Sequence, residues 1–72
     1  MKHLLLVFFG NRVALLRKDK KMTQEALALA SNLDRSYICG IESGRRNPTL
    51  TTMVKIANAL GVELKEMFTS KT

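Results

Sequence analysis

Polar side chains that can contact an anion or the edge of a base gather in the middle of the chain. Arg35 is the longest donor among them, and a guanidinium can donate two hydrogen bonds to the O6 and N7 atoms of guanine. Ser36 beside it is a shorter donor of lower specificity, and Tyr37 can reach either a phosphate or a base edge. Thr23 and Gln24 begin a predicted helix, where unpaired amides and the helix dipole attract an anion. These residues predict contacts with a nucleic acid, with Arg35 as the base reader.

Groups that catalyse reactions or bind metals are few. His3 is the only histidine and Cys39 is the only cysteine, so they supply neither a metal cluster nor a nucleophile with a histidine base. We expect His3 to be solvated and Cys39 to be a small packing residue. Gly40 and Gly44 lack the preceding strand and the Lys-Ser/Thr pair of a phosphate-binding loop. The sequence therefore predicts no enzyme, no metal and no cofactor.

Two short helices separated by a tight turn must position these side chains. Thr23 has the hydroxyl of a helix N-cap, and the segment after it alternates small and apolar residues over two turns. Asn32 tolerates the left-handed conformation that ends a helix, and Asp34 can cap a second helix over residues 35–43. Cap, helix, three-residue turn, cap and helix make up a helix-turn-helix motif, here at residues 23–43.

The second helix of this motif should be buried on the side of Ile38 and Ile41. At about 100° per residue, the opposite side carries short side chains, with Arg35 at its edge and Tyr37 on its flank. The short outward residues are Ser36, Cys39, Gly40 and Ser43. A helix with such a face can enter the major groove of double-stranded DNA and aim one long donor at the bases.

The remaining segments predict three further helices. Residues 4–9 fit a strand or a buried helix equally well, but a helical apolar stripe follows. That stripe consists of Phe9, Val13 and Leu16. Thr49 can cap a helix that stops at Gly61, and a last short helix is expected at residues 63–68. We therefore expect a single all-α domain over residues 1–72, built as a compact five-helix fold.

Length and charge narrow the class of protein. Seventy-two residues make one domain near the lower size limit for an unaided core. The net charge of +6 and the pI of about 10.0 point to a polyanionic partner. A single cysteine fits a reducing compartment. The apolar run at residues 4–9 is far shorter than the roughly 20 residues that span a bilayer, and no cleavage pattern follows it. We expect a cytoplasmic protein with no membrane partner.

The motif resembles the helix-turn-helix of phage repressors and Cro/Xre-type regulators. The likeness is carried by Gln24, Ala28, Asn32, Leu33, Ile38 and Ile41. The segment SNLDRSYICGIESGRRNPTL resembles the recognition helix and following loop of restriction-modification controller proteins, and the whole likeness covers about residues 9–68. The resemblance implies the five-helix fold of the lambda repressor type. Lys21 departs from it, because many members have Gly there, so the turn after the first helix should be less relaxed.

The resemblance also implies roles for individual residues and for the whole protein. Arg46 and Asn47 match positions that grip the DNA backbone, and Arg17 and Glu42 match an ion pair that locks the first helix to the recognition helix. The function implied is that of a transcription regulator, most like a controller that binds pseudo-palindromic operators near its own promoter. RNA polymerase is then a further candidate partner. The alternatives in this class are a phage-type repressor and an antitoxin-type regulator.

Specific recognition by so small a domain predicts a homodimer, with two recognition helices about 34 to 36 Å apart on one face of the DNA. We expect the interface at the last helix, where Leu64 and Phe68 share a stripe and Met67 lies to one side. Phe8 and Leu15 are either ordinary surface or core residues or a patch that faces a partner. The alternative hypothesis from a different functional class is a protein-interaction adaptor, with Phe8, Leu15 and Met67 as its contact face.

Overall fold

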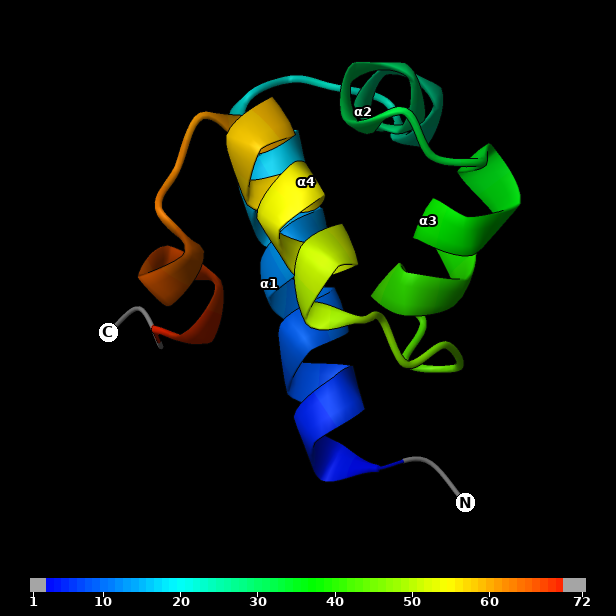
Figure 1. Cartoon of the computed structure of the whole chain (residues 1–72), viewed down its shortest axis with the longest axis vertical. Helices are drawn as coiled ribbons and strands as arrows, with labels where there is room; N and C mark the ends of the chain where they lie inside the picture. The colour runs from blue at the N-terminus through cyan, green and yellow to red at the C-terminus, as the bar shows by residue number, and fades with distance from the viewer. Residues whose placement is uncertain (1–2, 70–72) are drawn as a thin grey trace.

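The computed structural model describes residues 3–69, which form four α-helices and a final 3-10 helix (Figure 1). The elements in chain order are α1 (Leu4–Asp19), α2 (Gln24–Ser31), α3 (Arg35–Glu42), α4 (Leu50–Leu60) and η1 (Leu64–Phe68). No strand occurs in this part of the chain, so the all-α prediction is confirmed. The prediction of five α-helices is wrong in its last member, because η1 is a 3-10 helix.

The helix ends follow local side-chain chemistry. The hydroxyl oxygens of Thr23 and Thr49 accept hydrogen bonds from backbone amides in the first turns of α2 and α4, at 3.0 and 3.1 Å. Asn32 and Gly61 end the same two helices in the left-handed conformation, with φ of 60° and 72°. Asp34 occupies the N-cap position of α3, but its side chain makes no capping hydrogen bond. Asp34 therefore stands at the predicted N-cap position without making the hydrogen bond of a cap.

The apolar segment at residues 4–9 is helical, which resolves the open choice between strand and helix. His3 caps this helix, because its Nδ1 accepts a hydrogen bond from the amide of Leu5 at 3.1 Å. The predicted solvated histidine is exposed, as expected, and it also has this capping contact. As a result α1 is 16 residues long and extends well beyond the motif it supports.

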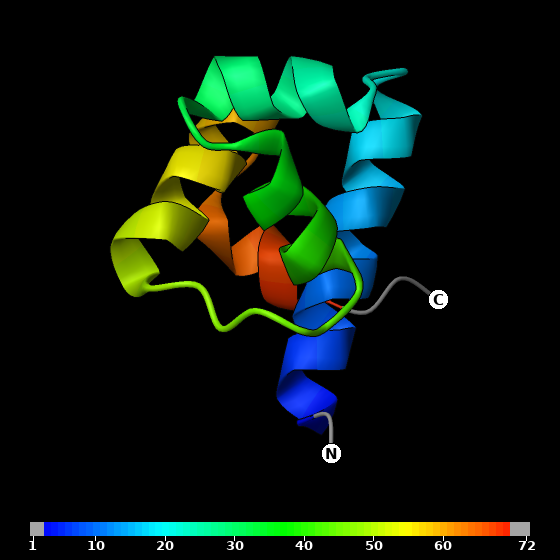
Figure 2. The same ribbon diagram turned by 90° about the vertical axis from the view of Figure 1, so that its right-hand side faces the viewer.

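The helices pack around one apolar core. In Figure 1, α4 lies in front of α1, and the turned view of Figure 2 shows these two helices on opposite sides of the molecule, with α2 across one end. α3 packs against α1 and α2, and η1 packs against α1 and α4. The core side chains come from every helix: Phe9, Val13, Leu16, Leu27, Ala28, Ile38, Ile41, Ile56, Ala57, Leu60 and Met67. Arg35 and Ser36, in the first turn of α3, remain exposed and can present polar groups to the outside.

Gly10 allows α1 to touch the end of α3 backbone to backbone. A Cβ atom at Gly10 would overlap the carbonyl oxygen of Ile41 and would lie 2.9 Å from that of Glu42. Glycine is therefore required here for close approach. The contact sets the angle at which α1 supports the helix-turn-helix.

The short η1 helix overturns one predicted interface residue. A 3-10 helix has about 3.0 residues per turn, so Leu64 and Met67 share its inner face, whereas an α-helix would have paired Leu64 with Phe68. Met67 is 0 % exposed, while Phe68 is 42 % exposed. Arg12 fixes this register by donating two hydrogen bonds to the carbonyl oxygen of Glu66, at 2.6 and 3.1 Å. Met67 is thus a core residue and cannot contact a partner chain, either in a dimer or in an adaptor.

Candidate nucleic-acid interface

α3 lies on the outside of the molecule and faces the viewer in Figure 2, and the polar residues of its first turn are exposed. Ile38 and Ile41 are fully buried, as predicted, and Arg35 and Ser36 are exposed on the other side. Because no neighbouring helix covers them, both side chains can approach a flat or grooved partner. Both lie in the first turn of α3, where a guanidinium and a hydroxyl can donate hydrogen bonds outward.

The loop after α3 returns over the helix and covers part of the face that was expected to be open. The amides of Arg45 and Arg46 both donate hydrogen bonds to the carbonyl oxygen of Gly40, at 2.9 and 3.2 Å. Gly40 is buried as a result, so its predicted outward exposure is wrong. Sequence reasoning missed this contact because the path of a loop is not encoded in helical periodicity.

Arg46 lies along α3 although its backbone belongs to the loop. Its guanidinium carbon is 4.7 Å from the centre of the Tyr37 ring, a cation–π contact. Its Cγ occupies the space that a Cβ atom at Gly40 would need. The structure therefore brings Arg46 to the same face as Ser36, with which it lines a shallow polar depression.

Ser43 and Arg45 form a second contact in this loop. The Ser43 hydroxyl donates to the carbonyl of Gly40 at 3.1 Å and accepts from Nε of Arg45 at 2.8 Å. Arg45 is exposed and lines the same depression, and it was not among the predicted site residues. The signal that could have found it is the adjacent pair of arginines in the loop, of which only Arg46 matched the family pattern.

The N-terminus of α2 lies beside the C-terminal end of α3. Thr23 is exposed, and its hydroxyl is used by the helix cap. Nε2 of Gln24 donates to Oε1 of Glu42 at 3.0 Å, so this side chain is held in one orientation. The amide has a second N–H that can donate to a phosphate. Both predicted residues thus remain at a helix N-terminus, close to the recognition helix.

Arg17 and Glu42 meet where α1, α2 and α3 converge. Nε and Nη2 of Arg17 donate to the two oxygens of Glu42, at 2.7 and 3.1 Å, and Nη1 donates to the carbonyl of Met22 at 2.7 Å. The two side chains are only 11 % and 8 % exposed. The hydrogen bond to Glu42 raises the pKa of Arg17 above the ordinary arginine value, although burial opposes the shift. The pair is bidentate, so it fixes α3 to α1.

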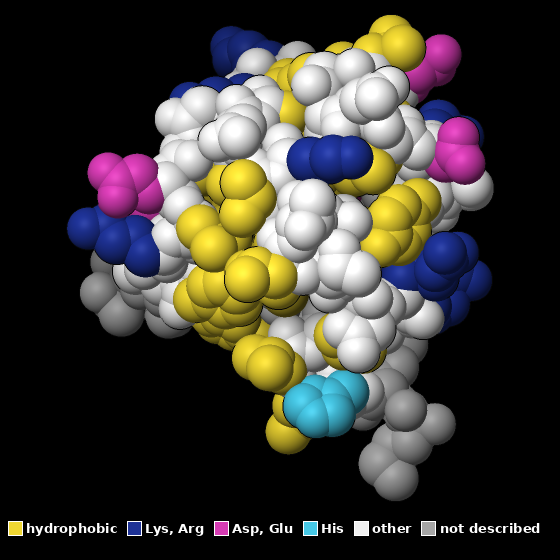
Figure 3. Space-filling model, in the orientation of Figure 1, with side chains coloured by type: hydrophobic (Ala, Val, Ile, Leu, Met, Phe, Trp, Pro, Cys, Tyr) yellow, Lys and Arg dark blue, Asp and Glu magenta, His cyan; other side chains and the backbone are white. Residues whose placement is uncertain are grey.

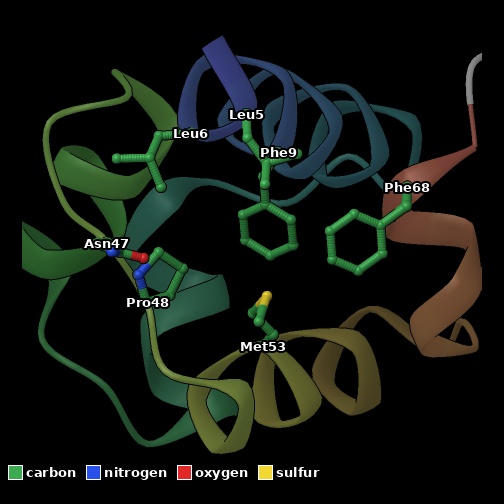
Figure 4. A pocket seen from close by; sticks show the side chains of 7 residues that line it. All are labelled: Leu5, Leu6, Phe9, Asn47, Pro48, Met53 and Phe68. Carbon is green, nitrogen blue, oxygen red and sulfur yellow. The ribbon is translucent and has the colours of Figure 1, made fainter. Parts of the chain in front are cut away.

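Asn47 lies away from the other predicted contacts. It is exposed at the rim of an apolar pocket of about 190 Å³, next to Pro48 (Figure 4). The pocket is lined by Leu5, Leu6, Phe9, Asn47, Pro48, Met53 and Phe68. The structure therefore brings Ser36, Tyr37 and Arg46 together, while Asn47, the next residue of the loop, lines the apolar pocket.

Three further observations on the described residues concern the free thiol, metal binding and membrane crossing. Cys39 is a free, half-buried thiol. Residues 3–69 contain no group of three or more His, Cys, Asp or Glu side chains placed to hold a metal ion. No helix in that range has the length and apolar character to cross a bilayer.

Comparison with known proteins identifies a matching family and related sequences. Residues 13–67 match the helix-turn-helix family. The control protein C.MunI of a Mycoplasma species is 44% identical over 61 residues, which are 83% of this chain and 82% of that protein. The immunity repressor of Bacillus phage phi105 is 41% identical over 63 residues, 88% of this chain but 44% of the repressor. The chain thus spans less than half the length of that repressor.

A solved structure resembles the whole fold. The crystal structure of the restriction-modification controller protein C.AhdI from Aeromonas hydrophila has a TM-score of 0.90 and 47% sequence identity. The match covers 92% of this chain and 100% of that one. The arrangement of helices around α3 is therefore shared along nearly the full length of both chains.

Proposed function

The chain belongs to the helix-turn-helix family of Cro/Xre-type regulators, and from this premise we propose that it is a restriction-modification controller. Its function is to bind double-stranded operator DNA sequence-specifically near its own promoter and to regulate transcription. The observation that carries the proposal is the open face of α3, where Arg35 and Ser36 point outward above a side sealed by Ile38 and Ile41. This is the arrangement that a recognition helix needs in a major groove.

The site residues divide into two roles under this proposal. Arg35 reads a guanine through O6 and N7, with Ser36 as a shorter partner. Phosphate contacts come from the N-terminus of α2 and from the loop after α3. These contacts are assigned to Thr23, Gln24, Ser43, Arg46 and Asn47, and Tyr37 can contact either a phosphate or a base edge. No catalytic step is part of the proposal.

A homodimer places two copies of α3 on successive major grooves, about 34 to 36 Å apart. Because Met67 is buried, the interface must use other side chains at the η1 end of the domain. Large apolar side chains remain exposed there, and we call them the apolar surface: Leu5, Leu50, Val54 and Phe68. Figure 3 shows hydrophobic side chains gathered in the lower left part of the face that it displays. Leu5 and Phe68 also line the apolar pocket of Figure 4. Leu64 packs against the core, and the ring of Phe68 lies against that of Phe9, with ring centroids 5.5 Å apart.

Three alternative functions differ in the support that they have. A phage-type repressor is favoured by the 41% identity to the phi105 immunity repressor, but this chain spans only 44% of that protein. An antitoxin-type regulator and a protein-interaction adaptor have no specific support from the geometry, and the adaptor loses Met67 from its expected contact face. RNA polymerase at the promoter is a further proposed partner, and the cytoplasm is the compartment in which such a regulator meets its DNA.

A mobility-shift experiment tests the function. The probe is a duplex with the DNA that lies upstream of the protein's own gene, and the competitor is a duplex of the same length and scrambled sequence. Retention that survives excess competitor supports a sequence-specific regulator. Absence of retention, together with a defined complex with another protein, would favour the adaptor instead.

A further inference from the structure

A glycine in the middle of α3 has no explanation in the helix itself. Alanine is a better helix former than glycine, and Gly40 has neither a positive φ nor a turn to make. Gly10 is different, because a Cβ there would strike the backbone of α3. At Gly40 the atoms in the way belong to one side chain, that of Arg46.

The loop backbone holds the stem of Arg46 above Gly40. Two amides, those of Arg45 and Arg46, donate to the carbonyl oxygen of Gly40 at 2.9 and 3.2 Å. The start of the Arg46 side chain is therefore anchored to the same residue whose missing Cβ makes room for Cγ. From this notch the side chain runs back along α3, and its guanidinium reaches the Tyr37 ring one turn earlier, at 4.7 Å from the ring centre.

The charge of Arg46 remains directed to the outside. The ion pairs of the described chain, Arg17 with Glu42 and Lys65 with Glu63, involve neither Arg46 nor its neighbour Arg45. Stacking on an aromatic face leaves the edge of a guanidinium able to donate hydrogen bonds in the ring plane. The fixed side chain can therefore donate to an acceptor that approaches the face of Ser36.

We infer that Gly40 and Tyr37 form a cradle that holds Arg46 on the recognition face before DNA arrives, which makes Gly40 a positioning residue for DNA affinity. The inference rests on the proposed function. A free arginine side chain loses much rotamer entropy when it is fixed on a ligand, and a side chain that is already fixed loses less. Gly40 thus exchanges helix stability for a pre-organised contact with the anionic backbone of DNA.

A double-mutant cycle on Gly40→Ala and Arg46→Ala tests the coupling. Affinity for the upstream duplex is measured for the wild type, both single variants and the double variant. We expect each single variant to lose on the order of tenfold in affinity, the loss of one charge-assisted contact, and the double variant to lose no more than Arg46→Ala alone. If Gly40→Ala lowers affinity by the same factor when Arg46 is already alanine, Gly40 acts on the DNA directly and the cradle is rejected.

Thermal unfolding of the same four proteins separates positioning from damage to the fold. In the Arg46→Ala background the clashing Cγ is gone and the Cβ of residue 46 lies at 3.5 Å, an ordinary contact distance. Gly40→Ala should then raise the melting temperature as an ordinary Gly-to-Ala change in a helix. In the wild-type background the same change must displace Arg46 and should raise it less or lower it. Equal shifts in both backgrounds would contradict a steric conflict with Arg46.

Proton NMR on the free protein makes the cradle testable without DNA. A methylene next to an aromatic face is shifted upfield, so the δ protons of Arg46 should be shifted in the wild type and in Tyr37→Phe. They should return to ordinary positions in Tyr37→Leu and in Gly40→Ala. Unshifted protons in the wild type overturn the cradle whatever the DNA result. A shifted wild type that retains no duplex would reject the proposed function and keep the cradle as a structural feature.

Discussion

Glu42 accepts two hydrogen bonds from the guanidinium of Arg17, at 2.7 Å from Nε and 3.1 Å from Nη2. Gln24 adds a third bond to the same carboxylate at 3.0 Å, and Arg17 also caps the carbonyl of Met22. One carboxylate therefore joins the end of α1, the start of α2 and the end of α3. The orientation of the recognition helix depends on this junction.

Replacing Glu42 by alanine should destabilise the protein by about 3 kcal/mol, because it leaves the Arg17 guanidinium charged and unpaired in a site that is 11 % exposed. For a domain of this size the melting temperature should fall by more than about 10 °C. Thermal unfolding followed by circular dichroism measures the change. Glu25→Ala is the matched control, since Glu25 is exposed in the first turn of α2.

The direction of the Arg17 pKa shift determines how its contribution to stability depends on pH. A raised pKa of Arg17 means that the stability it contributes is fully present below the ordinary arginine pKa and is lost only as pH rises through the higher folded value. The Arg17 charge should therefore contribute no pH dependence between about pH 6 and about pH 9.

Equal, small shifts in melting temperature for Glu42→Ala and Glu25→Ala would show that the junction adds nothing to stability.

Arg35→Ala should relax base preference at one position of each half-site. The expected loss of discrimination is about 1 to 3 kcal/mol, the usual value for a bidentate contact to guanine. Titrations on the preferred duplex and on a set of single-base variants measure it. Unchanged preference across that set would remove Arg35 from the base-reading role.

Arg46→Ala should weaken binding to all sequences alike, because its assigned partner is a phosphate. The plot of log affinity against log salt concentration should become shallower by about one counterion. Titrations at several salt concentrations measure the slope. Lys65→Ala is the control, since Lys65 is an exposed cation of η1, outside the recognition face. A change in base preference in place of a uniform loss would assign Arg46 to the bases.

Local signals in the sequence were sufficient to predict most helix boundaries. Thr23 and Thr49 cap helices through hydroxyl groups, and Asn32 and Gly61 end them with positive φ, all of which depend on residues within one turn. The buried side of α3 followed from the spacing of Ile38 and Ile41 for the same reason. Such features need no knowledge of the rest of the fold.

Features that depend on contacts distant in sequence were not predictable. η1 is a 3-10 helix whose carbonyl at Glu66 is held by Arg12, 54 residues earlier, and this moved Met67 from the expected surface into the core. Gly40 was expected to be open because helical geometry alone cannot place the loop that carries Arg46. In both cases a long arginine side chain contacts a residue of another segment. The periodicity of a single helix does not predict such a contact.

Lys21→Gly should stabilise the protein. Lys21 has a φ of 58°, and a residue with a Cβ adopts the left-handed region at a cost of about 1 kcal/mol. Glycine removes this cost, but part of the gain in stability is lost because glycine makes the unfolded chain more flexible. The melting temperature should rise by a few degrees. Lys20→Gly is the matched control, because Lys20 is also exposed but has a φ of −86° and gains nothing from glycine. A decrease for both variants would mean that Lys21 is not strained.

The homodimer predicts a charge-sensitive contact on the apolar surface. Leu50 is 62 % exposed at the start of α4, one turn before Met53, which lines the pocket together with Phe68. Burying apolar side chains between two copies removes them from water, so a glutamate at this position should oppose association. Leu50→Glu is therefore expected to raise the dimer dissociation constant by at least about tenfold while leaving the helical content unchanged.

Leu29→Glu is the control for this change. Leu29 is 78 % exposed on α2, at the opposite end of α4 from Leu50 (Figure 1), so it tests the effect of a surface charge without touching the apolar surface. Sedimentation equilibrium over a range of concentrations measures both variants and the wild type. A wild type that is monomeric at tens of micromolar would reject the dimer. A wild-type dimer that Leu50→Glu leaves intact would place the interface on another face, and Leu29→Glu would then report whether α2 forms it.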